Sequence, residues 1–411
     1  MPTNRDREIL RALAQTVSEL ASLPEMSDKR RMWRALNALK PERPMVMIDQ
    51  VCWNEMNVDD ELTNQCTDAQ CQGYETTLRR IIYRYKHMSA DYVVDGWIPV
   101  PMAITGANLG VAADEQTQIT DPTSDVLSHK YSNQIQHIDD IYKVKMPVVG
   151  HDIKETERRL SFARDIFDGV IEVRPQGWDP YISVWDPITS WMGIENALVA
   201  LMDEPDLIHA LVDRVVAAYM SMLDQMVEKG LLTGPQSWIH CTGAWTDELP
   251  PSGYNPAQPR TKDIWAFGLA QMLGSVSPAM YNEFEIEPCK PMLNRFGLVY
   301  YGCCEPLDDR LNLVRKIGNV RKVSMSPWVK EARGAEAIGG EFVYSRKPNP
   351  ALLGSPAFDE TEVRRTLTAT RDLCKQYKCP LEFIQKDIST VQYEPERLWR
   401  WSQIAMEVAL G

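Results

Sequence analysis

The sequence predicts an α/β fold, a (β/α)8 TIM barrel with an N-terminal helical extension. Eight short apolar or β-branched runs recur along the chain, and amphipathic helical patterns separate most of them. Strands that alternate with helices form a parallel sheet with right-handed crossovers, and eight such units can close into a barrel. The length of 411 residues suits one barrel with insertions. We therefore expect a helical extension over residues 1–40 and a barrel over residues 41–411.

The expected strands are short, as strands in sheets usually are. In chain order they are Pro44–Asp49, Asp91–Gly96, Gly169–Val173, Ser237–Thr242, Leu298–Cys303, Lys322–Ser326, Glu341–Ser345 and Leu381–Gln385. The longest expected helix, Pro205–Lys229, has Asp203 as a candidate N-cap and Gly230 just beyond its last turn. Further expected helices are Glu75–Met88, Lys154–Phe167, one opened by Ser277-Pro278, Glu362–Tyr377 and Leu398–Leu410.

Composition and charge limit the class of partner. The chain carries a net charge of −13 and has no basic block, so neither nucleic acid nor a membrane surface is an expected partner. Residues 1–23 lack a signal-peptide pattern, and no apolar run reaches the roughly 18 residues that a spanning helix needs. We expect a cytoplasmic protein whose nine cysteines are thiols.

The stretch Leu298–Pro306 is the most informative segment for chemistry. An apolar strand pattern stops at Gly302 and is followed at once by Cys303, Cys304 and Glu305. In α/β barrels and open α/β sheets, the reactive groups lie at the C-terminal ends of the strands. This segment therefore predicts a functional site at a junction between a strand and a helix.

Several segments carry a resemblance to a known family. They are Asp203-Glu-Pro-Asp-Leu207 before the long helix, Ser277-Pro-Ala-Met-Tyr-Asn-Glu-Phe284, Gly302-Cys303-Cys304, and Ile388-Ser-Thr-Val-Gln-Tyr-Glu-Pro-Glu-Arg397 near the end. In their order and spacing, over about residues 40–410, the chain resembles the uroporphyrinogen decarboxylase superfamily, which includes corrinoid-dependent methyltransferases. The resemblance implies a (β/α)8 barrel, a methyl-transfer reaction with a corrinoid protein as partner, and a homodimer.

The chain departs from the family pattern in two places. True decarboxylases have an arginine-rich segment after the first strand, whereas Gln50–Asn57 has no arginine and contains Glu55, which would repel a polycarboxylate substrate. This favours the methyltransferase branch. The zinc-binding methyltransferases carry a His-x-Cys at the end of the fifth strand, and here Tyr301 stands in the place of that histidine. The usual set of zinc ligands is therefore incomplete.

A different set of side chains can hold zinc. His240 ends the fourth expected strand, and Cys303 and Glu305 follow the fifth, so these groups can converge around one ion with an open position. Zinc would act there as a Lewis acid that eases the departure of an oxygen or sulfur. The alternative is that His240 binds a backbone carbonyl and that Cys303 and Cys304 are small buried hydrophobic residues.

Charged residues follow other expected strands. Asp95 follows the second, Arg174 the third, Lys347 the seventh, and Lys386-Asp387 the eighth. A carboxylate there can act as a general acid or substrate anchor, and a cation can hold a carboxylate or support an oxyanion. The alternative is that these residues cap helices or form ion pairs at the rim.

Tryptophans are frequent near the same expected strand ends. They are Trp53, Trp97, Trp178, Trp238, Trp245 and Trp328. Their rings can stack on an aromatic substrate or attract a quaternary ammonium group, although they can equally pack the mouth of the barrel. We assign to substrate binding Trp53, Trp97, Trp178, Trp245, Arg174, Cys304 and Asp387.

Together these observations predict a methyltransferase that moves a methyl group from a small methylated donor, such as an aromatic methyl ether, to cobalamin on a corrinoid protein. The expected catalytic residues are Asp95, His240, Glu305 and Lys347, and the expected zinc ligands are His240, Cys303 and Glu305. Two alternatives stay open. One is a lyase or decarboxylase without a corrinoid that acts on a small carboxylic acid, and the other is a catalytically silent barrel that binds a ligand.

Overall fold

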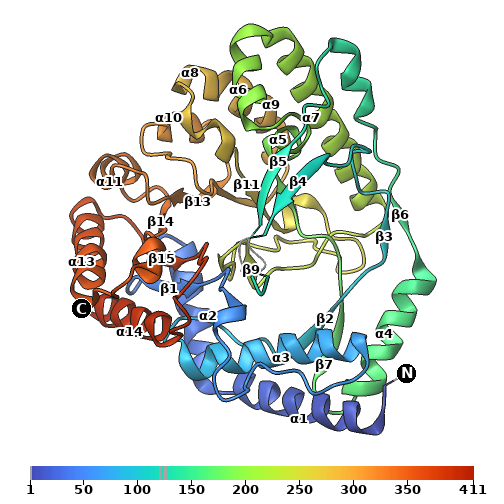
Figure 1. The fold of residues 1–411 in the computed structure, drawn as a ribbon, viewed down its shortest axis with the longest axis vertical. Coiled ribbons are helices and arrows are strands. Elements are labelled where there is room, and N and C mark those ends of the chain that lie inside the picture. The colour runs from blue at the N-terminus through green and yellow to red at the C-terminus, as the bar shows by residue number, and fades with distance from the viewer. Residues whose placement is uncertain (1, 120–121, 125–126) are drawn as a thin grey trace.

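The largest sheet of the protein is parallel and has seven strands. The computed structural model describes residues 2–119, 122–124 and 127–411, and it shows a mixed α/β fold (Figure 1). The strand order is β1-β15-β14-β13-β12-β11-β8. These strands are β1 (Met45–Ile48), β8 (Tyr181–Ile182), β11 (Trp265–Gly268), β12 (Leu298–Tyr301), β13 (Val320–Met325), β14 (Val343–Arg346) and β15 (Leu381–Gln385). Five of the eight expected strands therefore lie in this sheet at or near their expected bounds.

The expected closed ring of eight strands is not shown. Among the described residues, the pairing of the large sheet stops at β1 on one edge and at β8 on the other. The expected second strand meets β1 through the N–H of Asp91, which donates to the Val46 carbonyl at 2.8 Å, but its regular strand begins only at Trp97. The expectation that Asp91–Gly96 pairs as a barrel strand is therefore wrong.

The expected fourth strand is a hairpin instead. Residues Trp238–Ile239 (β9) and Thr242–Gly243 (β10) pair antiparallel with each other. His240 lies in the turn between them with a φ of 52°, which an extended strand cannot accommodate. Ile239 and Cys241 pack into the same buried cluster as Met47 of β1 and Phe267 of β11. The hairpin thus fills the concave side of the open sheet.

The remaining strands form small sheets away from the large one. The strand expected at Gly169–Val173 is β7 (Glu172–Gln176), which pairs in parallel with β2 (Trp97–Pro101). Two antiparallel pairs complete the set: β3 (Ile104–Thr105) with β6 (Gly150–His151), and β4 (Glu115–Gln118) with β5 (Ser128–Tyr131). The β2–β7 pair packs with the N-terminal helix, since Ile98 shares a buried cluster with Leu10 and Leu160.

Helices surround the sheet and contain more residues than the strands do. They are α1 (Asn4–Ala21), α2 (Pro24–Asn37), α3 (Ala69–His87), α4 (Ile153–Phe167), α5 (Trp185–Met192), α6 (Ile194–Asp203), α7 (Pro205–Glu228), α8 (Pro278–Tyr281), α9 (Glu287–Leu293), α10 (Leu311–Val314), α11 (Glu331–Ile338), α12 (Ala351–Gly354), α13 (Glu360–Tyr377) and α14 (Glu396–Leu410). Ser277 caps α8 as expected, because its Oγ accepts the N–H of Met280. No helix in the described ranges is both long and apolar enough to cross a bilayer.

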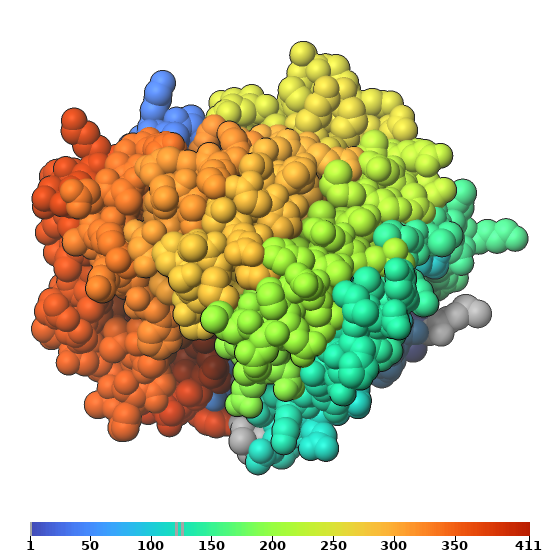
Figure 2. All heavy atoms as spheres, turned by 90° about the horizontal axis from the view of Figure 1, so that it is seen from above, coloured from blue at the N-terminus to red at the C-terminus, as the bar shows by residue number. Residues whose placement is uncertain are grey.

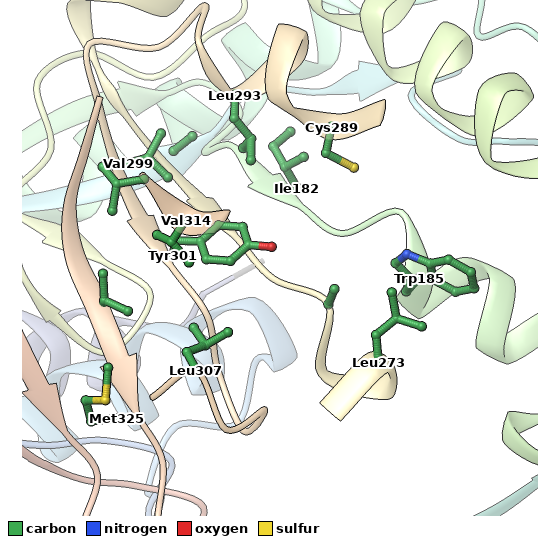
Figure 3. Packing of buried hydrophobic residues seen from close by; sticks show 14 of the residues in the cluster. Ile182, Trp185, Leu273, Cys289, Leu293, Val299, Tyr301, Leu307, Val314 and Met325 are labelled. Carbon is green, nitrogen blue, oxygen red and sulfur yellow. The ribbon is translucent and has the colours of Figure 1, made fainter. Parts of the chain in front are cut away.

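The large sheet separates two buried regions. Side chains of alternate residues point to opposite faces of a strand, and in β12 this sends Tyr300 to the concave face and Tyr301 to the convex face. Figure 3 shows Tyr301 on the convex face near Val314, Leu307 and Ile182. In the space-filling view of Figure 2, α8–α11 and α5–α7 meet in one continuous outer surface that hides the strands.

Candidate active site

Five reactive side chains meet near the C-terminal ends of β12 and β15. Cys303 and Cys304 follow β12, Lys386 and Asp387 follow β15, and His240 reaches them from the turn of the β9–β10 hairpin. The ends of parallel strands lie at one edge of a sheet, which explains why the first four converge. His240, Cys303 and Cys304, which were predicted to converge, lie together here, and Lys386 and Asp387 complete the group, whereas the predicted fourth member, Glu305, does not join it. We call these five residues the thiol cluster.

Cys303 lies at the centre of the thiol cluster. Its Sγ is 3.2 Å from Lys386 Nζ, 3.6 Å from Cys304 Sγ and 3.9 Å from His240 Nε2. Hydrogen bonding from the Cys304 thiol lowers the pKa of Cys303, and the charges of Lys347 and Lys386 lower it further against the effect of burial. The same contact raises the pKa of Cys304. Of the two sulfurs, Cys303 is the one that the ammonium of Lys386, 3.2 Å away, favours as the thiolate.

His240 connects the thiol cluster to its surroundings. Its ring stacks on Phe267, with centroids 3.9 Å apart and planes 7° apart, and its Nε2 lies 3.2 Å from Lys386 Nζ. Burial lowers the pKa of His240, but Cys241 and Cys303 outweigh burial and raise it to about 9. An imidazolium would repel the ammonium of Lys386 at this separation. From the geometry we assign the neutral ring, with Nε2 as acceptor and the proton on Nδ1.

Glu305 and Lys347 hold the backbone of the cysteine segment. Both carboxylate oxygens of Glu305 accept backbone N–H groups, from Ala270 at 2.9 Å and from Cys303 at 2.8 Å. Lys347 is buried and donates to the carbonyl of Cys303 at 3.0 Å, and Ser324 donates to the same carbonyl. Both expected catalytic residues therefore position Cys303 through its main chain instead of facing a substrate.

The residues do not fit the expected zinc ion. Within the ranges that the structure describes, no group of three or more His, Cys, Asp or Glu side chains has the arrangement of a metal site. The ammonium of Lys386 lies 3.2 Å from both His240 Nε2 and Cys303 Sγ, where a shared ion would have to bind. Glu305, the third expected ligand, is committed to backbone N–H groups. The positive charge of this site comes from a lysine.

Two cavities lie on either side of the segment that leads to His240. Each has a volume of about 290 Å³, and both are lined by Ser237 and Trp238. The first is also lined by Trp33, Met47, Asp49, Arg84, Tyr92, Val93, Asp95, Gly243 and Trp245. The second is also lined by Trp97, Gln176, Asp179, Pro180, Tyr181, Thr233, Pro235, Gln236, Ile239, His240 and Phe267. The second cavity therefore borders the thiol cluster through His240.

Asp95 belongs to the first cavity and not to the thiol cluster. Its Oδ2 accepts a hydrogen bond from Ser237 Oγ at 2.6 Å. Burial raises the pKa of Asp95, although Ser237 and the charges of Arg30 and Arg174 act in the opposite direction. A carboxyl group of this kind can bind a ligand or exchange a proton in the first cavity.

The expected substrate-binding residues divide into two groups. Trp97 lines the second cavity and Trp245 lines the first. Trp53 lies outside both cavities and packs edge-on against Tyr83, with ring centroids 5.9 Å apart. Trp178 bridges to Leu232 and packs on the large core. The expected gathering of all four indoles around one mouth is therefore wrong.

Arg174 lies at the surface beside the second cavity. Its guanidinium binds both oxygens of Glu172, at 2.7 and 2.6 Å, and its charged end is 5.3 Å from the centre of the Trp97 ring. A bidentate ion pair satisfies this cation locally. Arg174 thus supports Trp97 from behind and does not contact the cavity directly.

Some site residues had only a weak signal in the sequence. Lys386 follows an expected strand, so its place at the rim could be predicted, but its contact with Cys303 could not. Phe267 lies in the apolar run from Ile264 to Leu269, which has the composition of a buried strand and could have been recognised as β11. Ser237 had no such signal, because its role depends on how the hairpin folds.

Comparison with known proteins gives one informative likeness. No protein-family model matches the chain, and no curated protein matches it. A solved structure of a methyltransferase from Methanosarcina mazei has a TM-score of 0.50 at 10% sequence identity, covering 92% of this chain and 98% of that chain. At this identity the likeness shows the fold alone. The chain therefore shares its overall fold, over nearly its full length, with that methyltransferase.

Proposed function

We propose that this protein is a methyltransferase that moves a methyl group from a small methylated donor to a corrinoid protein. The observation that carries the proposal is the thiol cluster, in which His240 contacts Lys386 and lies near Cys303 while it borders an aromatic cavity of about 290 Å³. The fold shared with a methyltransferase supports it. Membership of the uroporphyrinogen decarboxylase superfamily, with an opened variant of its (β/α)8 barrel, is part of the same proposal.

The second cavity is the proposed site of the donor. Trp97, Tyr181, Trp238 and Phe267 offer flat apolar surfaces to an aromatic ring, each worth about 0.5–1.5 kcal/mol beyond its buried area. An aromatic methyl ether has a shape and polarity that suit these walls. Its ether oxygen would lie toward His240, which borders the same cavity.

His240 would protonate the departing oxygen. When the bond between oxygen and methyl carbon breaks, the oxygen keeps the electron pair and takes the proton from His240 Nδ1. His240 Nε2 accepts a proton from Lys386 Nζ, 3.2 Å away, so the ring stays neutral. Such proton transfer typically contributes about 10²–10⁴-fold to a rate. The lysine thereby supplies the positive charge that a zinc ion was expected to supply.

The corrinoid would supply the nucleophile that accepts the methyl group. We propose that it is carried on a partner protein, as the resemblance implies, and that the chain acts as a homodimer. Light scattering of the purified protein tests the dimer: a monomer at micromolar concentration would contradict that part of the proposal without affecting the chemistry.

The decisive experiment is a transfer assay with purified protein, free cob(I)alamin and a panel of methoxyarenes. We expect the visible spectrum of cob(I)alamin to disappear only when protein and donor are both present, with release of one phenol for each methyl group. A protein that methylates no cobalamin with any donor of the panel, in its reduced form, would contradict the proposal.

A matched pair of histidine variants sharpens this assay. We expect His240→Gln to lower the transfer rate by about 10²–10⁴-fold, because it removes the proton donor. His209 is the control, since it also stacks on a phenylalanine, Phe284, with centroids 4.5 Å apart, but lies on α7 at the surface. His209→Gln should leave the rate unchanged. Equal effects of the two substitutions would mean that His240 acts only through packing.

A further inference from the structure

Cys303 and Cys304 are reactive groups that the proposed methyl transfer does not use. Proton delivery uses Lys386 and His240, whereas neither sulfur has to react. Yet the two sulfurs lie 3.6 Å apart, and Lys386 Nζ lies 3.2 Å from Cys303 Sγ. Cys303 is 6% exposed, whereas Cys304 is only partly buried, so Cys304 is the more accessible of the two.

We propose that Cys303 and Cys304 form a reversible oxidation site for hydroperoxides, at which the two thiols close to a disulfide. Redox-sensing cysteines combine a stabilised thiolate with a nearby resolving thiol. Cys303 has the first property through the ammonium of Lys386, which lies 3.2 Å from its sulfur, and Cys304 supplies the second. The oxidation itself needs only this geometry. Its consequence, loss of methyl transfer, rests on the proposed function.

The two cysteines, Lys386 and the hydroperoxide supply every group that the reaction needs. The thiolate of Cys303 attacks one oxygen of hydrogen peroxide, the O–O bond breaks, and hydroxide leaves with a proton from Lys386, forming water and a sulfenic acid. The thiol of Cys304 then attacks the sulfur of Cys303, an S–S bond forms, and a second water leaves. The two sulfurs are oxidised and the hydroperoxide is reduced.

The same geometry makes the disulfide easy to reduce. Consecutive Cα atoms are about 3.8 Å apart across a trans peptide bond, which is shorter than the roughly 4.4–6.8 Å that disulfides prefer. A disulfide between adjacent cysteines is therefore strained, and strained disulfides have higher reduction potentials. Cellular thiols would reopen it, so the modification is a reversible switch. Closing the ring would also remove the thiolate from Lys386 and alter the charge beside His240.

Another pair of cysteines provides an internal comparison. Cys374 and Cys379 are buried between α11 and α13, and the thiol of Cys379 donates to the Ala335 carbonyl at 3.2 Å. Tryptic cleavage places these two residues in different peptides, Asp372–Lys375 and Cys379–Lys386. Cys303 and Cys304 share the peptide Phe296–Arg310, which contains no other cysteine. Mass spectrometry therefore distinguishes the two pairs directly.

The test is peptide mass spectrometry of the full-length protein after treatment with hydrogen peroxide and alkylation of the remaining thiols. We expect the peptide Phe296–Arg310 to lose two hydrogen atoms and to resist alkylation, and dithiothreitol to restore the dithiol form. Cys304→Ser should instead accumulate a sulfenic acid at Cys303 that dimedone traps. Cys374→Ser, the matched control, should leave the oxidation of Phe296–Arg310 unchanged.

The outcomes separate the two proposals. If Phe296–Arg310 keeps both thiols while other cysteines oxidise, or if its oxidation proceeds equally without Cys304, the oxidation site is overturned. These readouts need no methyl transfer, so they hold even if the reduced protein transfers no methyl group to cobalamin. A protein that forms the disulfide and retains full transfer activity would overturn the switch.

Discussion

The two faces of the large sheet bury ionisable groups in opposite ways. On the concave face, Lys322 and Glu382 are both fully buried and form an ion pair at 2.8 Å. On the convex face, the buried carboxyl group of Glu285 accepts from Tyr301 Oη at 3.0 Å and from the Cys289 thiol at 3.3 Å. One carboxylate therefore has a cation as its partner, whereas the partners named for the other are neutral.

This difference separates a charged interior from a neutral one. Burial lowers the pKa of Lys322, although Glu382 opposes that effect. Burial raises the pKa of Glu285 to about 8, against the effect of its two hydrogen-bond donors. The concave face thus keeps charges in the interior, continuing up to Lys386 at the rim. The convex face holds an acid that stays protonated near neutral pH, as a core packed under helices favours.

The largest expected effect comes from breaking the concave ion pair. Lys322→Met should lower the free energy of unfolding by about 3–5 kcal/mol, because it leaves the Glu382 carboxylate buried without its cation. Urea denaturation followed by circular dichroism measures the change. Removing one partner of a buried ion pair destabilises a protein mainly because the other charge stays buried without a partner. Removing both charges should therefore restore stability, and this provides the control.

That control is the double variant Lys322→Met/Glu382→Leu. Replacing both partners of a buried ion pair by apolar groups is often neutral, so the double variant should recover most of the lost stability. If the double variant is as unstable as the sum of the two single variants, the pair is not the cause. The loss of stability would then be assigned to the hydrogen bond that Thr242 donates to Glu382 at 2.7 Å.

The convex face gives a pH-dependent effect of intermediate size. The pKa of Glu285 rises from 4.5 to about 8 on folding, so the folded protein binds one more proton than the unfolded chain between these values. Stability therefore falls as the pH rises through this window. Glu285→Gln should remove the fall, making the variant more stable than the parent by roughly 2–4 kcal/mol near pH 9 and similar to it near pH 5.

Glu283→Gln is the matched control for this measurement. Glu283 lies in the same π-helical turn, Asn282–Ile286, but is about half exposed and pairs with His209. Its substitution should not change how unfolding depends on pH. The assignment of a protonated Glu285 would be contradicted if the difference in unfolding free energy between the parent protein and Glu285→Gln stayed constant between about pH 5 and pH 9.

The regular half of the fold could be predicted from the sequence. Strands β12 to β15 are rich in hydrophobic and β-branched residues, because nearly all of their positions are buried, although polar residues such as Lys322 and Glu382 interrupt the runs. The cysteines after β12 and the lysine after β15 could therefore be assigned to one edge. Gly302 marked the end of β12, and its φ of 92° suits a residue without a side chain.

The irregular half could not be predicted. The run from Ser237 to Thr242 has strand composition, but it turns at His240 and packs into the concave side. The run is apolar enough to form either a strand of the large sheet or a hairpin packed against it, so only the tertiary structure shows which of the two it forms. The position of Glu305 could not be predicted for a related reason: its carboxylate accepts backbone N–H groups that only the folded chain brings to it, so it does not join His240 and Cys303 as the zinc prediction expected.

The smallest expected effect concerns the rim of the concave face, where Lys386 supports the thiolate of Cys303. Lys386→Met should raise the pKa of Cys303, because an opposite charge at this distance favours the ionised form. The thiolate then forms only at higher pH, so alkylation of Cys303 at neutral pH slows by about tenfold or more. Mass spectrometry of the peptide Phe296–Arg310 over a range of pH follows this rate.

The control is Lys375→Met, which replaces an exposed lysine on α13 and should leave the dependence of the alkylation rate on pH unchanged. An unshifted profile in Lys386→Met would mean that Lys347 stabilises the thiolate without Lys386, and the rim of the concave face would then lack the reactive ion pair that distinguishes it from the fixed pair inside the sheet.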